Sequence, residues 1–338
     1  MSVRETTIVL IEDSHRFSAS YGGGLASHLP MALLALDAMG AGDERIEAYA
    51  KRYAAQLEPM PPAADTIGAG DEQRFLGSAA AFPSWVAYFV ARIAAEGRDK
   101  VMREWTTRLT PGIGSAAFHG VIRTAYALDA GSDAELSHAL AYWACAYEPL
   151  HQFSTPAGKR TPAEILTQIS KDPGFAGKKL PGRSIAGRMV AASRLREFGG
   201  WVASADPARL NLDSLAAAVI RAYAATGDFT ILHAVTGTHA TRALLRHVDS
   251  PTALVGALWR ALLAAYVGVG APPVSGWRLE GDDKLDWPAI HERACRCDDE
   301  HDVKITYSCW RGWQWTGDDL YRRVASSIVT RATAGVAS

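Results

Sequence analysis

Residues 119–131 read HGVIRTAYALDAG, and residues 132–147 continue as SDAELSHALAYWACAY. Apolar residues recur in both segments at spacings of three and four, which is the pattern of an amphipathic helix. Ser132 lies between the segments, where its side chain can cap the second helix. The stretch therefore predicts a helical hairpin that begins with a histidine.

Three further segments follow the same plan of a histidine, about three turns of helix, a capping residue and a second helical run. They begin at His28, His233 and His301, with capping residues Asp43, Ser250 and Asp318. Including the first hairpin, the separations from histidine to cap are 15, 13, 17 and 17 residues in chain order. Four pseudo-repeated hairpins predict an all-α fold, and we expect one large helical domain over residues 1–338.

The segment from His301 to Trp310 also fits a strand, because Val303, Ile305 and Tyr307 alternate along it. In a strand, His301 and Lys304 would face opposite sides, whereas in a helix they would share a face. The hairpin plan and the alanine-rich context favour the helix.

Composition and charge exclude several classes of protein. The 338 residues include 35 Lys and Arg against 36 Asp and Glu, which gives a formal net charge of -1. A chain with so little net charge is not built mainly to neutralise nucleic acid. With 48% hydrophobic and 21% charged residues, it is expected to fold as an ordinary globular protein.

The sequence also bears on location. The first 17 residues lack the pattern of a secretory signal, so we expect a cytoplasmic protein with reduced cysteines. The most apolar tract, residues 258–269, contains Arg260 and is shorter than the roughly 20 apolar residues that span a bilayer. We therefore expect no membrane helix.

The four histidines that open the hairpins suggest a metal site. Neutral imidazole is the commonest metal ligand, and equivalent helix ends in a bundle can bring His28, His119, His233 and His301 together. Iron, zinc or copper would suit such a site. Lys304 can join it only as a neutral amine or as a carbamate formed with carbon dioxide, because an ammonium group is repelled by a cation. Any of these residues alone would be an ordinary structural histidine or a solvated lysine.

Other interpretations remain open. His291, Cys295, Cys297 and His301 are zinc-type ligands within eleven residues, but one residue between the cysteines is not the spacing of common zinc fingers. Arg123 lies four residues after His119 and is a candidate partner of a phenolate or acid, or a member of a structural ion pair. His239, six residues after His233, is a candidate proton carrier or a structural residue. The chain has no P-loop, no GxGxxG after a strand, no HExxH and no GxSxG.

Several segments together resemble the questin oxidase-like family. They are SHLPMALLALDAMGA (27–41), FPSWVAYFVARIAAEG (82–97), LTPGIGSAAFHGVIRTAYALDAG (109–131), LAYWACAY (140–147), LHAVTGTHATRALL (232–245) and DDEHDVKITYS (298–308). The similarity runs in order from about His15 to Ile328, and HGVIRTAYAL and HAVTG are its most specific parts.

The resemblance implies a largely helical oxygenase that uses O2 and is associated with NADPH. Fungal members oxidatively cleave a ring of anthraquinones in polyketide pathways, so an aromatic small molecule is the implied substrate. The resemblance also implies a non-haem Fe(II) held by His28, His119, His233, His301 and a carboxylated Lys304. The chain departs from the family at Ala26-Ser27, where Ser-Asn is frequent, which leaves the surroundings of the first histidine open.

Two other functions remain as alternatives. A metal-free, NADPH-dependent monooxygenase would keep the substrate pocket, although no dinucleotide fingerprint supports direct NADPH binding. A non-catalytic helical protein that binds a ligand would use the histidines structurally. The sequence does not indicate the exact substrate, the electron donor or the oligomeric state.

Overall fold

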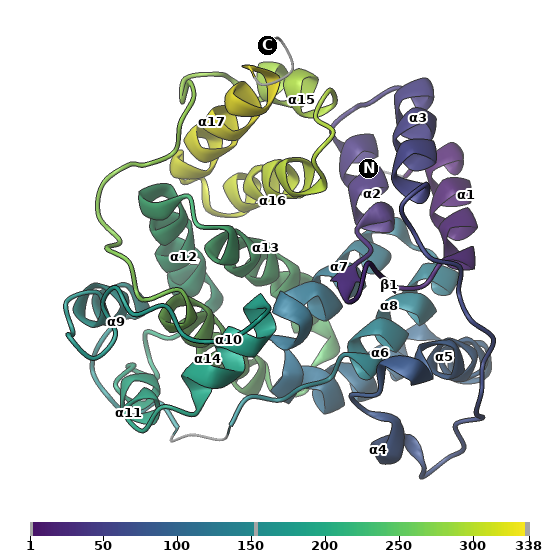
Figure 1. The fold of residues 1–338 in the computed structure, drawn as a ribbon, viewed down its shortest axis with the longest axis horizontal. Helices are drawn as coiled ribbons and strands as arrows, with labels where there is room; N and C mark the ends of the chain where they lie inside the picture. The colour runs from purple at the N-terminus through teal and green to yellow at the C-terminus, as the bar shows by residue number, and fades with distance from the viewer. Residues whose placement is uncertain (1–2, 152–154, 335–338) are drawn as a thin grey trace. The chain divides into compact units, whose positions relative to one another are not determined.

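The structure is a computed structural model that describes residues 3–151 and 155–334, so the predicted domain limits, 1 and 338, lie outside the described residues. The all-α prediction is confirmed. The described part of the chain contains helices α1 to α17, short 3-10 turns and one sheet of two strands (Figure 1).

The chain divides into two compact units, which are described separately. Unit 1 comprises Met1–Trp105, Ile122–Tyr147 and Glu280–Ser338, and unit 2 comprises Thr106–Val121 and Glu148–Leu279. Two of the four boundaries fall within α6 (Arg98–Leu109) and α7 (His119–Ala130), and the other two, after Tyr147 and after Leu279, lie between helices. That the chain forms one domain stays a prediction.

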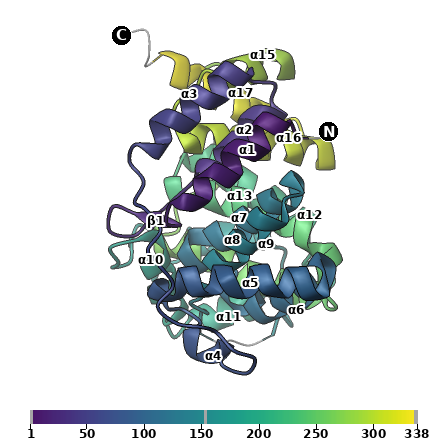
Figure 2. The same cartoon turned by 90° about the vertical axis from the view of Figure 1, so that its right-hand side faces the viewer.

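Unit 1 contains most of the N-terminal and all of the C-terminal helices. Besides parts of α6 and α7, its elements are α1 (Glu5–Asp13), β1 (Ser20–Tyr21), β2 (Leu25–Ala26), α2 (Leu29–Ala38), α3 (Asp43–Ala54), α4 (Glu72–Phe75), α5 (Phe82–Glu96), α8 (Asp133–Cys145), α15 (Trp287–Ala294), α16 (Glu300–Thr316) and α17 (Leu320–Ala334). Figures 1 and 2 both show α1, α2 and α3 side by side. Helix α2 also packs against α16, which in turn packs against α17.

An aromatic cluster fills part of the core of unit 1. Trp85 and Phe89 on α5 lie with ring centroids 5.1 and 4.8 Å from Trp105, and all three side chains are fully buried. Stacked and edge-to-face rings of this kind add to the stability that burial already provides. The cluster anchors α5, which packs along α8.

Unit 2 is built around three long helices. Its elements are α9 (Pro162–Ile169), α10 (Ile185–Ser193), α11 (Phe198–Ala203), α12 (Leu212–Thr226), α13 (Phe229–Leu244) and α14 (Pro251–Gly268). Helix α14 is long and apolar enough to cross a membrane, but 72% of this 18-residue span is buried, as in the core helix of a water-soluble protein. It packs against α10 and α13, and the Trp259 indole donates a hydrogen bond to the Val202 carbonyl (3.2 Å).

All four predicted helix pairs are present as α2 with α3, α7 with α8, α13 with α14, and α16 with α17. Their starts differ, however. His28 precedes α2 and His119 begins α7, whereas His233 lies inside α13, because Asp228 caps that helix by accepting from the amides of Thr230 and Ile231. Gly42, not Asp43, is the N-cap of α3. The repeat relationship therefore stays a prediction.

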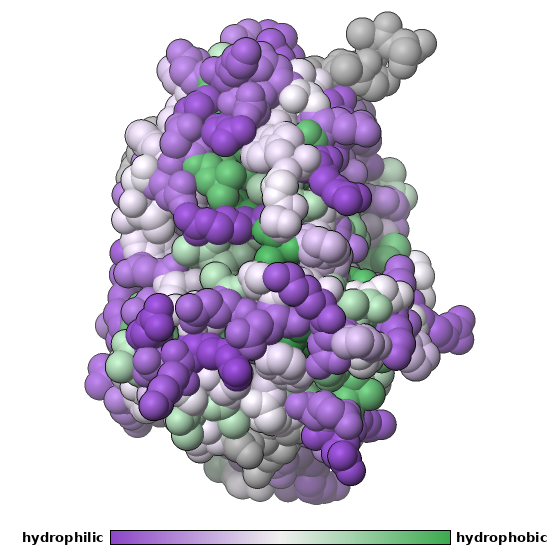
Figure 3. All heavy atoms as spheres, turned by 90° about the vertical axis from the view of Figure 1, so that its left-hand side faces the viewer, coloured by the Kyte–Doolittle hydropathy of each residue, from purple (hydrophilic) through white to green (hydrophobic). Residues whose placement is uncertain are grey.

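The face shown in Figure 3 is largely hydrophilic, with hydrophobic areas between the hydrophilic ones. Among the described residues, the large apolar side chains that stand out as exposed are Val9, Leu25, Val90 and Phe229. Leu25 lies three residues before His28, and Phe229 lies four residues before His233. Single exposed apolar residues are common on globular proteins and carry no conclusion here.

Candidate metal centre

Unit 1 brings His28 and His301 together. Their ring centroids lie 4.7 Å apart at an angle of 80°, because α2 packs against the start of α16. His301 is placed by Asp299, the N-cap of α16, whose carboxylate accepts from the backbone amides of His301 and Asp302. The His28 side chain is 5% exposed and that of His301 17%. Imidazoles this close in a largely buried place are suited to share a cation.

Glu300 completes this group, and sequence reasoning missed it. Its Oε1 atom lies 3.5 Å from His28 Nδ1 and 3.6 Å from His301 Nδ1. The potential ligand atoms of His28, Glu300 and His301 all lie within 4.8 Å of one another, and among the described residues they form the group recognised as able to hold a metal ion. The signal that could have identified Glu300 from the sequence is its position directly before His301.

Lys304 lies one turn further along the same helix. The helical interpretation of the segment is confirmed by α16, so Lys304 and His301 share a face, and Lys304 is 1% exposed. Burial lowers the pKa of Lys304 to about 7. The nearby carboxylates of Glu300 and Asp299 raise this pKa, but their effect is smaller than that of burial. No hydrogen bond or ion pair links its amine to another residue in the described ranges. Burying a charged amine without such a partner costs free energy, which favours the neutral form.

Unit 2 brings His119 and His233 together, with ring centroids 4.9 Å apart. The Nδ1 atom of His119 lies 2.5 Å from the Ala116 carbonyl oxygen, and that of His233 lies 2.8 Å from the Phe229 carbonyl oxygen. Because a carbonyl oxygen only accepts, both Nδ1 atoms carry a proton, and in the neutral imidazole this leaves Nε2 with the lone pair. Histidines that bind metals are commonly held in this way.

A strained turn supplies one of these carbonyls. Ala116, Ala117 and Phe118 have φ angles of 47, 56 and 68°, in the left-handed region that residues other than glycine rarely adopt. The turn directs the Ala116 carbonyl at His119, and the buried Phe118 ring lies against Gly237 of α13. Such strain persists only where the surrounding packing enforces it.

Arg123 lies in a buried ion pair within unit 1. Its guanidinium donates to both carboxylate oxygens of Glu135 (2.7 and 3.0 Å), and the Nε2 of His15 lies 2.8 Å from the same carboxylate. His15 in turn stacks on His138 at 3.8 Å. Burial lowers the pKa of His138 to about 3, with His15 and Arg123 acting in the same direction, so its ring is neutral. These contacts give Arg123 a structural role, and its catalytic role stays a prediction.

Acid is expected to weaken this cluster. Burial raises the pKa of Glu135, but Arg123 and His15 outweigh it and lower the pKa to about 2 from an ordinary value of 4.5. Since the folded-state pKa is depressed, the stabilisation is complete above pH 4.5 and is lost as the pH falls towards 2. We expect a loss on the order of 3 kcal/mol, measured by urea unfolding across this range. A variant with both Arg123→Met and Glu135→Leu should lack this part of the pH dependence, and an unchanged acid slope in that variant would contradict the assignment.

The remaining candidates lie elsewhere. His239 is partly buried on α13, six residues after His233, and its predicted role in proton transfer stays a prediction. The alternative zinc site gains no support, because the Cys295 thiol donates to the Met39 carbonyl and the Cys297 thiol to the Arg293 carbonyl. Burial also raises the pKa values of these thiols to about 11 and about 12.

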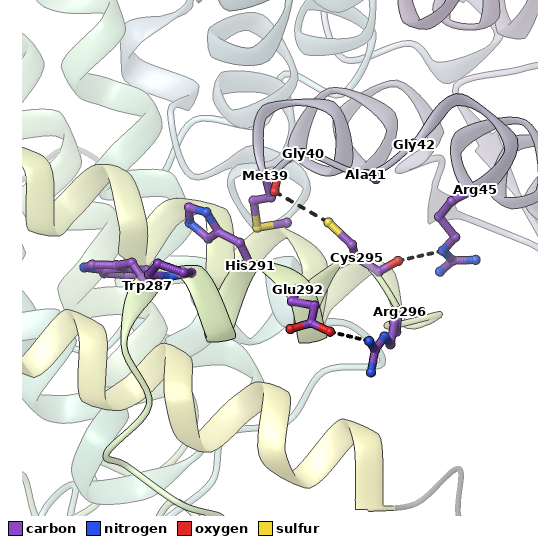
Figure 4. A pocket seen from close by; sticks show the side chains of 11 residues that line it. Met39, Gly40, Ala41, Gly42, Arg45, Trp287, His291, Glu292, Cys295 and Arg296 are labelled. Carbon is purple, nitrogen blue, oxygen red and sulfur yellow. Dashed lines mark hydrogen bonds and ion pairs between the residues drawn. The ribbon is translucent and has the colours of Figure 1, made fainter.

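A pocket of about 800 Å³ lies in unit 1 between α15 and the loop from α2 to α3 (Figure 4). Its lining includes Trp287 and His291 on α15, Cys295 directly after that helix, and Arg45 on α3. Arg45 is already bound to the Cys295 carbonyl (2.7 Å), and His291 packs edge-on against Trp310, with ring centroids 4.4 Å apart. The pocket contains none of the paired histidines.

Comparison with protein-family models identifies a match over most of the chain. A family model described as questin oxidase-like matches residues 25–309 of the chain. The matched range contains all four paired histidines as well as Glu300 and Lys304. No curated protein matches the chain significantly. The family description indicates an oxidoreductase that acts on a small molecule.

Proposed function

This chain belongs to the questin oxidase-like family, and from that premise we propose that it is a non-haem iron oxygenase. Its substrate is an aromatic polyketide of the anthraquinone type, and its reaction is oxidative cleavage of a ring carbon–carbon bond with O2. One iron ion is bound by His28, His119, His233, His301 and a carboxylated Lys304. NADPH is the proposed source of any reducing equivalents that the substrate does not supply.

The observation that carries this proposal is the arrangement of the two histidine pairs. In unit 2 the two Nδ1 atoms donate to backbone carbonyls, and in unit 1 both Nδ1 atoms lie within 3.6 Å of a carboxylate oxygen. The two histidines of unit 2 are therefore suited to present Nε2 to a cation, and in unit 1 the two imidazoles lie with the Glu300 carboxylate in a group of potential metal ligands.

Lys304 also fits the proposed group. Its buried amine lies on the same helical face as His301, and a carbamate would give it two oxygens that share one negative charge in place of an ammonium. One negative charge among four neutral imidazoles partly offsets the charge of Fe(II). When bound, iron would supply the one-electron chemistry that allows O2 to react with a closed-shell aromatic compound.

The chain's own residues have defined tasks in this proposal. The backbone carbonyls of Ala116 and Phe229 fix the tautomer of His119 and His233, so that neither ring turns when the substrate binds. Burial of His28, His119 and His233 excludes bulk water from their surroundings. His239 and Arg123 are the proposed proton carriers, and Arg123 would have to act while bound to Glu135.

Metal content tests the proposal. Protein purified without oxygen and offered Fe(II) is expected to hold about one iron per chain by plasma mass spectrometry. We expect His301→Ala and His233→Ala, one from each pair, to remove this same ion. Lys304→Ala should weaken iron binding and remove any effect of added bicarbonate, because the carbamate can no longer form.

His291→Ala is the matched control, since His291 is also on a helix of unit 1 but belongs to neither pair. It should keep its iron. The absence of iron from the wild type even after Fe(II) is offered would overturn the proposal. If such metal-free protein still consumed O2 with an anthraquinone and NADPH, it would be a metal-free monooxygenase, and if it bound the quinone without consuming O2, a binding protein. Iron that survives both histidine substitutions would show that the pairs do not bind it.

A further inference from the structure

Helix α3 contributes no histidine to the pair in unit 1, yet its side chains hold both segments that carry one. Tyr53, in its last turn, accepts a hydrogen bond from the backbone amide of His28, and Arg45, near its start, donates to backbone carbonyls shortly before His301. We infer that α3 positions both histidines, His28 through Tyr53 and His301 through Arg45, and thereby sets the metal affinity of this pair. The role of the pair as metal ligands rests on the proposed function.

The contact at His28 lies inside unit 1. The Tyr53 hydroxyl oxygen is 3.1 Å from the His28 amide nitrogen, and both residues are buried. His28 is the N-cap of α2 and makes no side-chain cap of its own, so its amide depends on an acceptor outside the helix. Because this amide is bonded directly to the His28 Cα, the hydrogen bond fixes the point from which the imidazole projects.

The contact before His301 is a fork of two hydrogen bonds. The Nε atom of Arg45 donates to the Cys295 carbonyl (2.7 Å), as Figure 4 shows, and an Nη atom donates to the Cys297 carbonyl (2.6 Å). These carbonyls belong to the connection from α15 to α16, which leads into the N-cap Asp299 and so to His301. A planar guanidinium with donors in fixed directions is suited to hold such a connection in one conformation.

Arg52 adds a contact to the same connection. One of its Nη atoms donates to the Asp298 carbonyl (2.9 Å), and the Asp298 carboxylate lies 3.0 Å from Arg52 and 2.9 Å from Arg45. Both guanidinium groups lie over the ring of Tyr49, at 5.4 Å for Arg45 and 5.1 Å for Arg52. Tyr49 in turn stacks on Tyr53, with ring centroids 6.0 Å apart. The side chains that hold the two segments are therefore packed on one another along α3.

Affinity for Co(II), used in place of iron, measures the effect on the pair. Tyr53→Phe removes the acceptor of the His28 amide, and Arg45→Met removes the guanidinium donors but keeps an unbranched side chain. We expect each variant to lose about 10-fold in affinity, as is typical when a partner that orients a ligand is lost. Since the two residues act on different ligands, the double variant should lose about 100-fold. Arg45→Lys, which can reach one carbonyl, should recover part of the loss.

Two further tyrosine variants separate positioning from stability. Tyr49→Phe makes the same change one turn earlier on α3, where the buried hydroxyl has no hydrogen-bond partner within the described residues, and should bind Co(II) as the wild type does. Tyr88→Phe, on α5, removes a hydroxyl that donates to Glu72 (2.9 Å), so it should lower stability in urea and leave Co(II) affinity unchanged.

The affinities also contain the results that would overturn the inference. One is a loss in either control as large as the loss in Tyr53→Phe. The second is an unchanged affinity in both Tyr53→Phe and Arg45→Met. The third is a double variant that binds Co(II) no more weakly than the weaker single variant, because the two residues would then not act on separate ligands.

Amide hydrogen exchange gives a readout that needs no metal. In the metal-free protein, Tyr53→Phe is expected to speed exchange of the His28 amide about 10-fold. Arg45→Met should do the same for the amide of His301, which the Asp299 carboxylate holds, and each variant should leave the other amide unchanged. If the wild type binds no metal, the proposed function fails, but exchange still decides whether α3 holds the two segments. Unchanged exchange of both amides in the double variant would show that it does not.

Discussion

Arg123→Met is expected to lower the free energy of unfolding by about 3–5 kcal/mol, because it leaves the Glu135 carboxylate buried without its main counter-charge. The side chains of Arg123 and Glu135 are 5% and 2% exposed, and their contact is bidentate. His15 remains as a second partner of Glu135, but it also stacks on the neutral His138. Urea unfolding of the purified variant beside the wild type measures the loss.

Two further variants show whether the loss comes from the unpaired charge. The double variant with Arg123→Met and Glu135→Leu removes both charges and should recover much of the stability. Arg98→Met breaks the more exposed pair of Arg98 with Asp133, where the side chains are 34% and 59% exposed, and should change stability by less than about 1 kcal/mol. A loss of similar size in the Arg98 and Arg123 variants would contradict the assignment.

The same variants test the predicted catalytic role of Arg123. A double variant that folds, binds iron and still turns over the substrate would show that Arg123 acts through stability alone. One that folds and binds iron but has lost turnover would support a direct part for the guanidinium in the chemistry. The two outcomes distinguish a structural ion pair from a catalytic role of Arg123, which its position four residues after His119 does not decide.

Most of the fold prediction came from capping residues and helical periodicity, which are local sequence patterns. Ser132 and Ser250 do cap the helices that follow them, and the pattern of α16 was correctly favoured over a strand. The start of α13 was placed wrongly, because His233 was taken as the first residue, although the stronger cap at Asp228 lies five residues earlier.

The site was less accessible from sequence, because its contacts join distant segments. Glu300 faces His28 only because α2 packs against α16, and Arg123 meets Glu135 only across the turn from α7 to α8. The carbonyl that holds His119 depends on a left-handed turn formed by Ala116, Ala117 and Phe118, none of which is a glycine. No propensity predicts such a turn, since the surrounding packing enforces it.

Gly237→Ala is expected to have the second large effect, on both stability and metal binding. An added Cβ would lie 2.8–2.9 Å from three side-chain atoms of Phe118, a ring that is fully buried and follows two left-handed alanines. The ring cannot retreat without moving the turn that directs the Ala116 carbonyl at His119. We expect a loss of about 1–3 kcal/mol in unfolding free energy, with weaker iron binding.

Gly256→Ala provides the matched control, because Gly256 lies inside α14 of the same unit and its added Cβ meets nothing within 4 Å. Alanine is the better helix former, so this variant should be as stable as the wild type or gain up to about 1 kcal/mol, with iron binding unchanged. Adding Phe118→Leu to Gly237→Ala shortens the side chain that the new methyl group meets and should restore part of both properties. If Gly237→Ala instead matched Gly256→Ala in stability and iron content, the contact between Phe118 and Gly237 would not be what holds His119 in place.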